Sequence, residues 1–129
     1  RGIGMQQQVA AFLAALGIDV PADDPVLAYA QCAVYEELLN RLCVDEVPKG
    51  LEAMAVYRIA GQYLRLCKDA GRLEVPLEAA VRQVQEGDTS ITYALGEGDQ
   101  TPEGRFDRMT DWLCGYGEDQ LERYRRMLW

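Results

Sequence analysis

Apolar residues recur at helical spacing along most of this chain, and this period constrains the fold more than any other feature. Between Pro25 and about Cys43 the apolar positions that would face one way are Leu27, Ala30, Val34, Leu38 and Leu42. Asp24 directly before this stretch is typical of a helix N-cap, and Pro25 of a first helical residue. The pattern therefore predicts a helix that buries one face in a core.

A second helical stretch starts near Pro48 or Leu51 and runs to Ala70, before Gly71. Its apolar positions cover a wide arc: Leu51, Met54, Ala55, Val56, Ile59, Ala60, Tyr63, Leu64 and Cys67. Such width indicates contacts on two sides, as in the central helix of a bundle or a helix at a subunit interface. We interpret Ile59, Tyr63 and Leu64 as self-association residues. Because Gly61 weakens a helix by about 1 kcal/mol relative to Ala, we expect another helix to approach closely there.

Shorter helices are predicted towards both ends of the chain. Residues 5–16 carry an amphipathic pattern, Thr101-Pro102 repeats the cap-and-proline start of a helix that reaches Cys114, and a last helix follows from Glu118 to about Met127. A chain of 129 residues can build one core but not two. We expect a single mainly α domain over residues 1–129, a bundle of about four to five helices with the C-terminal ones within 101–127. The sequence starts at Arg1 and not at Met, so we expect a few residues to precede it.

One stretch departs from the helical period. Apolar and polar residues alternate from Thr89 to Leu95, which is the period of a strand with one buried face. Gly87-Asp88 before it suits a tight reversal. We predict an extended loop or β-hairpin over residues 81–95, projecting as an arm before the C-terminal helices. A helix from Pro76 to Gln85 is the alternative, since Leu77, Ala80, Val81 and Val84 also fit a helical stripe.

The charge of the chain argues against binding to nucleic-acid phosphates. The formal net charge is −8 and the isoelectric point is near 4.5, whereas phosphate contacts need clustered Lys and Arg. No apolar run approaches the roughly 20 residues that cross a bilayer, and no secretion signal is evident. A cytosolic protein is the default expectation.

Residues that carry enzyme chemistry are largely missing from the sequence. The chain has no histidine, which excludes Ser-His-Asp and Cys-His catalysis. The four cysteines, Cys32, Cys43, Cys67 and Cys114, form no CxxC pair, and we interpret them as small buried hydrophobes and not as metal ligands or redox groups. No phosphate-binding glycine loop is present. We therefore expect no enzyme activity, no metal and no cofactor.

Two polar segments are candidates for protein contacts. Gly87-Asp88-Thr89 lies on the predicted arm, where it is either a plain turn or a partner-binding loop. The chain ends in Tyr124-Arg125-Arg126-Met127-Leu128-Trp129, which contains aromatic and arginine residues of the kind enriched at interfaces. Docking of Leu128 and Trp129 on the chain's own bundle is the alternative for this end.

Three motifs in this order resemble the head–tail connector (adaptor) proteins of tailed bacteriophages. They are Pro48-Lys49-Gly50-Leu51-Glu52, Val84-Gln85-Glu86-Gly87-Asp88-Thr89-Ser90-Ile91 and Tyr124-Arg125-Arg126-Met127-Leu128-Trp129. The resemblance implies a small helical structural protein of the virion neck, without catalytic activity, that assembles in the host cytoplasm. Such a protein would form a ring of about twelve copies beneath the portal protein. It would extend the DNA channel, without specific DNA binding, and offer a surface to stopper or tail-completion proteins.

The resemblance also implies which residues make these contacts. The loop would reach the channel or a neighbouring ring through Glu86, Gly87, Asp88, Thr89, Ser90 and Ile91. The C-terminal segment would dock on the portal or an adjacent subunit through Tyr124, Arg125, Arg126 and Trp129. A small acidic regulatory or inhibitor protein with a single protein partner is the alternative function. A helical DNA-binding regulator is disfavoured because no basic recognition helix is present.

Overall fold

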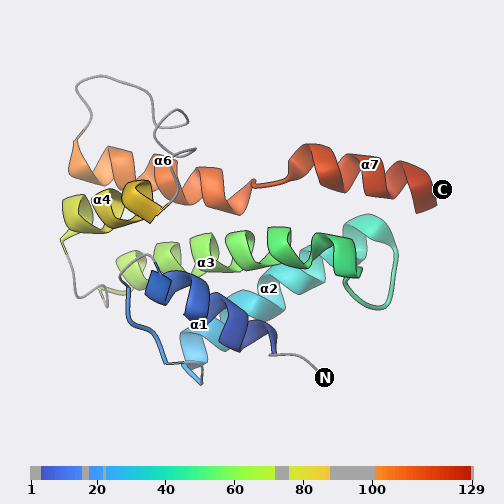
Figure 1. The fold of residues 1–129 in the computed structure, drawn as a ribbon, viewed down its shortest axis with the longest axis horizontal. Coiled ribbons are helices and arrows are strands. Elements are labelled where there is room, and N and C mark those ends of the chain that lie inside the picture. The colour runs from blue at the N-terminus through green and yellow to red at the C-terminus, as the bar shows by residue number, and fades with distance from the viewer. Residues whose placement is uncertain (1–3, 16–17, 22, 72–75, 88–100, 129) are drawn as a thin grey trace.

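The chain folds as a mainly α bundle, which confirms the predicted fold class. The computed structural model describes residues 4–15, 18–21, 23–71, 76–87 and 101–128. Its elements are α1 (Met5–Ala15), α2 (Pro25–Leu42), the 3-10 turn η1 (Lys49–Leu51), α3 (Glu52–Asp69), α4 (Leu77–Gly87), α6 (Pro102–Cys114) and α7 (Glu118–Leu128). The described residues contain no strand (Figure 1).

Helix α3 is the centre of the bundle. It packs against α1 and α2 on one side and against α6 on the other, as Figure 1 shows. Nearly all of the wide apolar arc is buried, including Leu51, Met54 and Ile59, and each such side chain contributes about 1.5–3 kcal/mol when fully buried. The arc is therefore explained by contacts within one chain.

Two helices start as the cap residues predict. The Asp24 carboxylate accepts a hydrogen bond from the Val26 amide at 2.8 Å, and the Thr101 hydroxyl accepts one from the Gly104 amide at 3.0 Å. A proline follows each cap. The second oxygen of Asp24 accepts a hydrogen bond from the buried Tyr63 hydroxyl at 3.2 Å. One capping carboxylate thus also fixes the start of α2 against α3.

Helices α3 and α6 lie very close to each other at Gly61. A Cβ atom added there would lie 2.6 Å from the Leu113 Cβ and 3.0 Å from the Cys114 backbone nitrogen. Carbon atoms do not approach this closely, so only glycine fits between the two helices as they stand. The expected close approach of another helix at Gly61 is confirmed.

The arm predicted over residues 81–95 is wrong for its first part, because residues 81–87 belong to α4. Ala80, Val81 and Val84 are buried, and α4 packs on α6. In a strand Ala80 and Val81 would point to opposite faces, whereas a helix places the whole stripe against α6. The alternative, a helix from Pro76 to Gln85, agrees with the observed bounds to within about two residues. The rest of the predicted arm, 88–95, lies outside the described residues.

The prediction that the cysteines are buried holds for one of them. Cys67 is buried and Cys114 is half-buried, but Cys32 and Cys43 are exposed. Cys32 stands two residues from both Ala30 and Val34, so it faces away from the buried stripe of α2. Cys43 follows the last turn of α2 and takes a positive φ of 56°. Both exposed positions follow from where α2 turns and ends.

Candidate protein-interaction surfaces

Helix α7 is anchored to the bundle through its first turns. The buried Arg58 side chain donates a hydrogen bond to the Tyr116 carbonyl oxygen at 2.9 Å and another to Glu118 at 3.1 Å. Arg41, near the end of α2, pairs with Glu118 and, at 2.9 Å, with Glu122. The hydrogen bond from Arg41 is the largest cause of a shift that lowers the pKa of Glu118 to about 2. Glu118 therefore stays ionised at neutral pH and holds α2, α3 and α7 together.

A second set of contacts ties the middle of α7 to the turn before α3. The Gln120 side-chain amide donates to the Gly50 carbonyl oxygen at 3.0 Å. The Tyr124 ring covers Gly50 so closely that an added Cβ would lie 2.9 Å from the tyrosine oxygen. Leu121 is buried, with 1% of its surface exposed. Two motifs of the resemblance, the one around Gly50 and the one that starts at Tyr124, are thus in direct contact.

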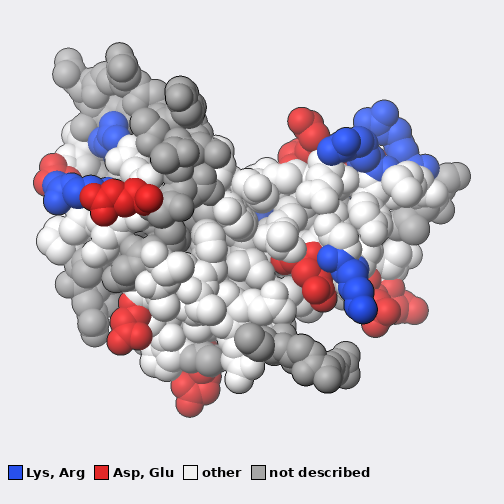
Figure 2. Space-filling model, in the orientation of Figure 1, with Lys and Arg blue, Asp and Glu red and all other residues white. Residues whose placement is uncertain are grey.

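The far end of α7 extends beyond these anchors and is exposed. Arg123 and Arg126 are exposed, and 81% of Met127 is accessible. Figure 2 shows Lys and Arg side chains gathered over this helix. We call residues 123–127 the basic tip. It contains three arginines within four positions, Arg123, Arg125 and Arg126.

The predicted contact residues fall into three groups. Glu86 is exposed near the end of α4, and Gly87 is its last residue. Tyr124 and Arg125 are half-buried and Arg126 is exposed. Asp88, Thr89, Ser90, Ile91 and Trp129 lie outside the described residues.

The residues predicted for self-association are not available to a neighbour. Ile59 and Leu64 have no exposed surface, and Tyr63 has 6%. Burial against α1, α2 and α6 accounts for the arc that suggested an interface, so this interpretation is wrong. Any contact between copies has to use other residues.

A cluster of four aromatic rings connects α1, α3 and α6 at the surface. Tyr57 stacks on Tyr116 with ring centres 4.0 Å apart and lies 4.7 Å from Phe12. Trp112 meets Tyr116 edge-on at 5.3 Å. All four rings are half-buried. Sequence analysis missed this cluster because its members are far apart in the chain, and only the spacing of Trp112 and Tyr116, one helical turn, was a local signal.

A groove lies beside this cluster, where α6 turns into α7. It has a volume of about 450 Å³ and is lined by Asp111, Trp112, Gly115, Tyr116, Gly117, Glu118 and Asp119. Its charged lining residues are all acidic. Asp111 pairs with Arg65, and Glu118 with Arg41 and Arg58. Asp119 is exposed and forms no ion pair within the part of the chain that the structure describes. We call this site the acidic groove.

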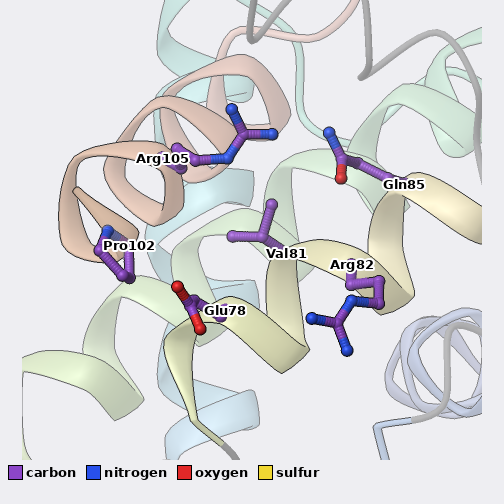
Figure 3. A pocket seen from close by; sticks show the side chains of 6 residues that line it. All are labelled: Glu78, Val81, Arg82, Gln85, Pro102 and Arg105. Carbon is purple, nitrogen blue, oxygen red and sulfur yellow. The ribbon is translucent and has the colours of Figure 1, made fainter. Parts of the chain in front are cut away.

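A smaller pocket of about 230 Å³ lies between α4 and α6. Figure 3 shows Glu78, Val81, Arg82 and Gln85 projecting from α4, and Pro102 and Arg105 from the first turns of α6. Two arginines against one glutamate give the lining a positive balance. The pocket adjoins the two points at which the chain leaves and re-enters the described region.

Neither a metal site nor a membrane span is present in the described ranges. No group of three or more His, Cys, Asp or Glu side chains there could hold a metal ion. No helix among them is long and apolar enough to cross a bilayer. A comparison of the chain with protein-family models, curated proteins and solved structures found no match.

Proposed function

We propose that this chain is a structural protein of the neck of a tailed bacteriophage. In this proposal it assembles as a ring beneath the portal protein, extends the DNA channel and joins the head to stopper or tail-completion proteins. The ring would form in the host cytoplasm and remain in the virion. The protein acts by its shape and its contacts, and not by catalysis.

One observation carries the proposal. Helix α7 is fixed to the bundle by Arg41, Arg58 and Gln120, while its far end is presented with Arg126 and Met127 exposed. That end belongs to the motif through which the resemblance implies docking on a portal or a neighbouring subunit. A helix that is anchored at one end and exposed at the other can dock its exposed end on a partner surface.

The fold is also consistent with the resemblance in element order. Helices precede the 88–100 segment, and two helices follow it. The loop residues Glu86 to Ile91 remain proposed contacts with the channel or a neighbouring ring. Because Ile59, Tyr63 and Leu64 are buried, the proposal assigns contacts between copies to the surface of the bundle and to α7.

The test is the molar mass in solution, measured by light scattering over a concentration series, with and without the portal ring encoded by the same genome. We expect a ring-sized species or co-elution with the portal. The variant Leu121→Asp places a charge in the buried contact of α7 and should weaken co-elution at least about tenfold. Tyr29→Ser is the matched control, since Tyr29 is 63% exposed on α2 and should not affect binding. A wild-type monomer that ignores the portal would favour the small acidic regulator instead.

A further inference from the structure

The charge of this protein is divided between an acidic body and a basic tip. The chain has a net charge of −8, and without the three arginines of the tip the remainder carries −11. Arg123 and Arg126 are exposed and form no ion pair among the residues that the structure describes. The positive charge of the basic tip is complementary to the negative charge on the body of another copy.

The acidic groove has the chemistry of a guanidinium receptor. Trp112 and Tyr116 line the groove and are half-buried, so an arginine side chain can pack on the exposed parts of their rings. Carboxylates at its margin can accept charge-assisted hydrogen bonds, and Asp119 is available for them. The exposed thioether of Met127 suits the same aromatic wall, because sulfur makes favourable contacts with ring edges.

The end of the tip, Arg126 and Met127, cannot reach the groove of its own chain. Helix α7 starts at the groove, with Glu118 and Asp119 in its lining, and continues to Leu128 without a break. At 1.5 Å per residue, Met127 lies about 14 Å along the axis from Glu118. A straight, anchored helix cannot fold back over that distance, so Arg126 and Met127 can enter only the groove of another copy. Arg123, one turn from Asp119, adds positive charge beside them.

We propose that the basic tip of one copy docks in the acidic groove of the next. Arg126, with Arg123 beside it, meets Asp119 and the rings of Trp112 and Tyr116, and Met127 packs on the aromatic wall. The two surfaces differ, so the contact is heterologous and repeats from copy to copy, closing into a ring when the rotation per copy allows it. This inference rests on the proposed function as a ring and identifies the residues that would join its subunits.

A charge-swap experiment tests this contact. The tip-reversed variant, Arg123→Glu with Arg126→Glu, and the groove-reversed variant, Asp119→Arg, should each weaken self-association at least about tenfold in sedimentation velocity runs. An equimolar mixture of the two should assemble again, since each reversed surface then meets a complementary one. A chain that carries all three substitutions should also assemble.

Matched controls use charges elsewhere on the surface. Arg82→Glu on α4 and Glu36→Arg on α2 change charges at exposed positions and should leave assembly unchanged. Circular dichroism melts verify that every variant is folded. Reversed variants that assemble like wild type, or a mixture that stays dissociated, would overturn the inference.

Measuring portal co-elution on the same variants separates this inference from the proposed function. If wild type assembles or binds the portal and the reversals have no effect on contacts between copies, the tip-to-groove contact is wrong and the neck function stands. If wild type neither self-associates nor binds the portal, both are overturned.

Discussion

At the scale of single residues, Arg58 joins the central helix to the turn before α7. Only 2% of this residue is exposed, and its guanidinium contacts the Tyr116 carbonyl, Glu118 and Glu37. A buried charge is costly unless it is paired and hydrogen-bonded, and here both conditions are met. Arg58 therefore fixes the position of Tyr116, and with it one wall of the acidic groove.

Replacing Gly61 by alanine should destabilise the protein, although helix propensity alone predicts that it would stabilise it. Gly61→Ala should gain about 1 kcal/mol from propensity, yet its Cβ would stand 2.6 Å from that of Leu113. Because both helix backbones would have to separate, we expect a net loss of about 1–3 kcal/mol in the free energy of unfolding, measured by urea denaturation.

Gly115→Ala is the control for this measurement. Gly115 ends α6 with a φ of −102°, and an added Cβ would meet only an ordinary contact at 3.4 Å. Its effect should stay within about 0.5 kcal/mol. A Gly61→Ala protein as stable as wild type would show that the contact between α3 and α6 is looser than described.

At the scale of helices, the anchoring of α7 depends on the ionised carboxylate of Glu118. The pKa of this group falls from 4.5 to about 2 on folding, chiefly through the hydrogen bond from Arg41. A lowered pKa means that the ionised form stabilises the folded state fully above about pH 4.5 and that this stabilisation is lost as the pH falls towards 2. The first turn of α7 should therefore loosen over that acid range.

The Gln120 side-chain amide, hydrogen-bonded to Gly50, reports this change by NMR. We expect its chemical shift to move between pH 4.5 and about 2, the interval set by the pKa of Glu118. In Glu118→Gln the carboxylate is missing, so the step in this interval should disappear. A wild-type transition centred at or above pH 4.5 would contradict the pairing with Arg41.

Most helices could be predicted from the sequence because their signals are local. Asp24-Pro25 and Thr101-Pro102 mark helix starts within a few residues, and the stripe from Leu27 to Leu42 fixes which face of α2 is buried. The end of α4 was misjudged because the arm was extended back to Val81, although the alternation of apolar and polar residues begins only at Thr89. Local patterns give each segment a preference for helix or strand. Where the two preferences are similar, packing on a neighbouring element decides between them.

The candidate site could be predicted only in part. The arginine end of α7 is continuous in sequence and was predicted as a contact surface; the structure shows that Arg123 and Arg126 are exposed. The acidic groove was not, although its lining residues all lie within 111–119. The position of Tyr116 in its wall depends on stacking against Tyr57 of α3, a tertiary contact that local patterns do not show. The self-association residues of α3 failed for the same reason, since a wide apolar arc is identical in sequence whether its second side meets the same chain or another.

At the scale of the whole molecule, the separation of charge predicts how assembly responds to salt. The proposed contact between the basic tip and the acidic groove would act over a few ångströms, whereas repulsion between whole copies of net charge −8 acts over longer distances. The Debye length is about 10 Å at 0.1 M salt and about 3 Å at 1 M, so body repulsion is already weak at the lower value. Raising NaCl over this range should weaken self-association by about tenfold, as measured by sedimentation velocity.

The tip-reversed variant supplies the comparison for this salt series. Since it lacks the complementary arginines, its residual association should change little over the same range. Wild-type association that strengthens with salt would indicate an apolar contact and would argue against pairing through Arg123 and Arg126.

The close contact between Gly61 and α6 also limits how far α6 can move relative to α3. In a closed ring the same interface is repeated once per copy. A small angular error at that interface therefore adds up over all subunits and can prevent the ring from closing. Flexible side chains between two helices would allow such an error, but at Gly61 the backbone of α3 meets Leu113 and Cys114 with nothing in between. The end of α6 that carries the groove is thus held rigidly against α3, a rigidity that the proposed ring would need in each of its subunits.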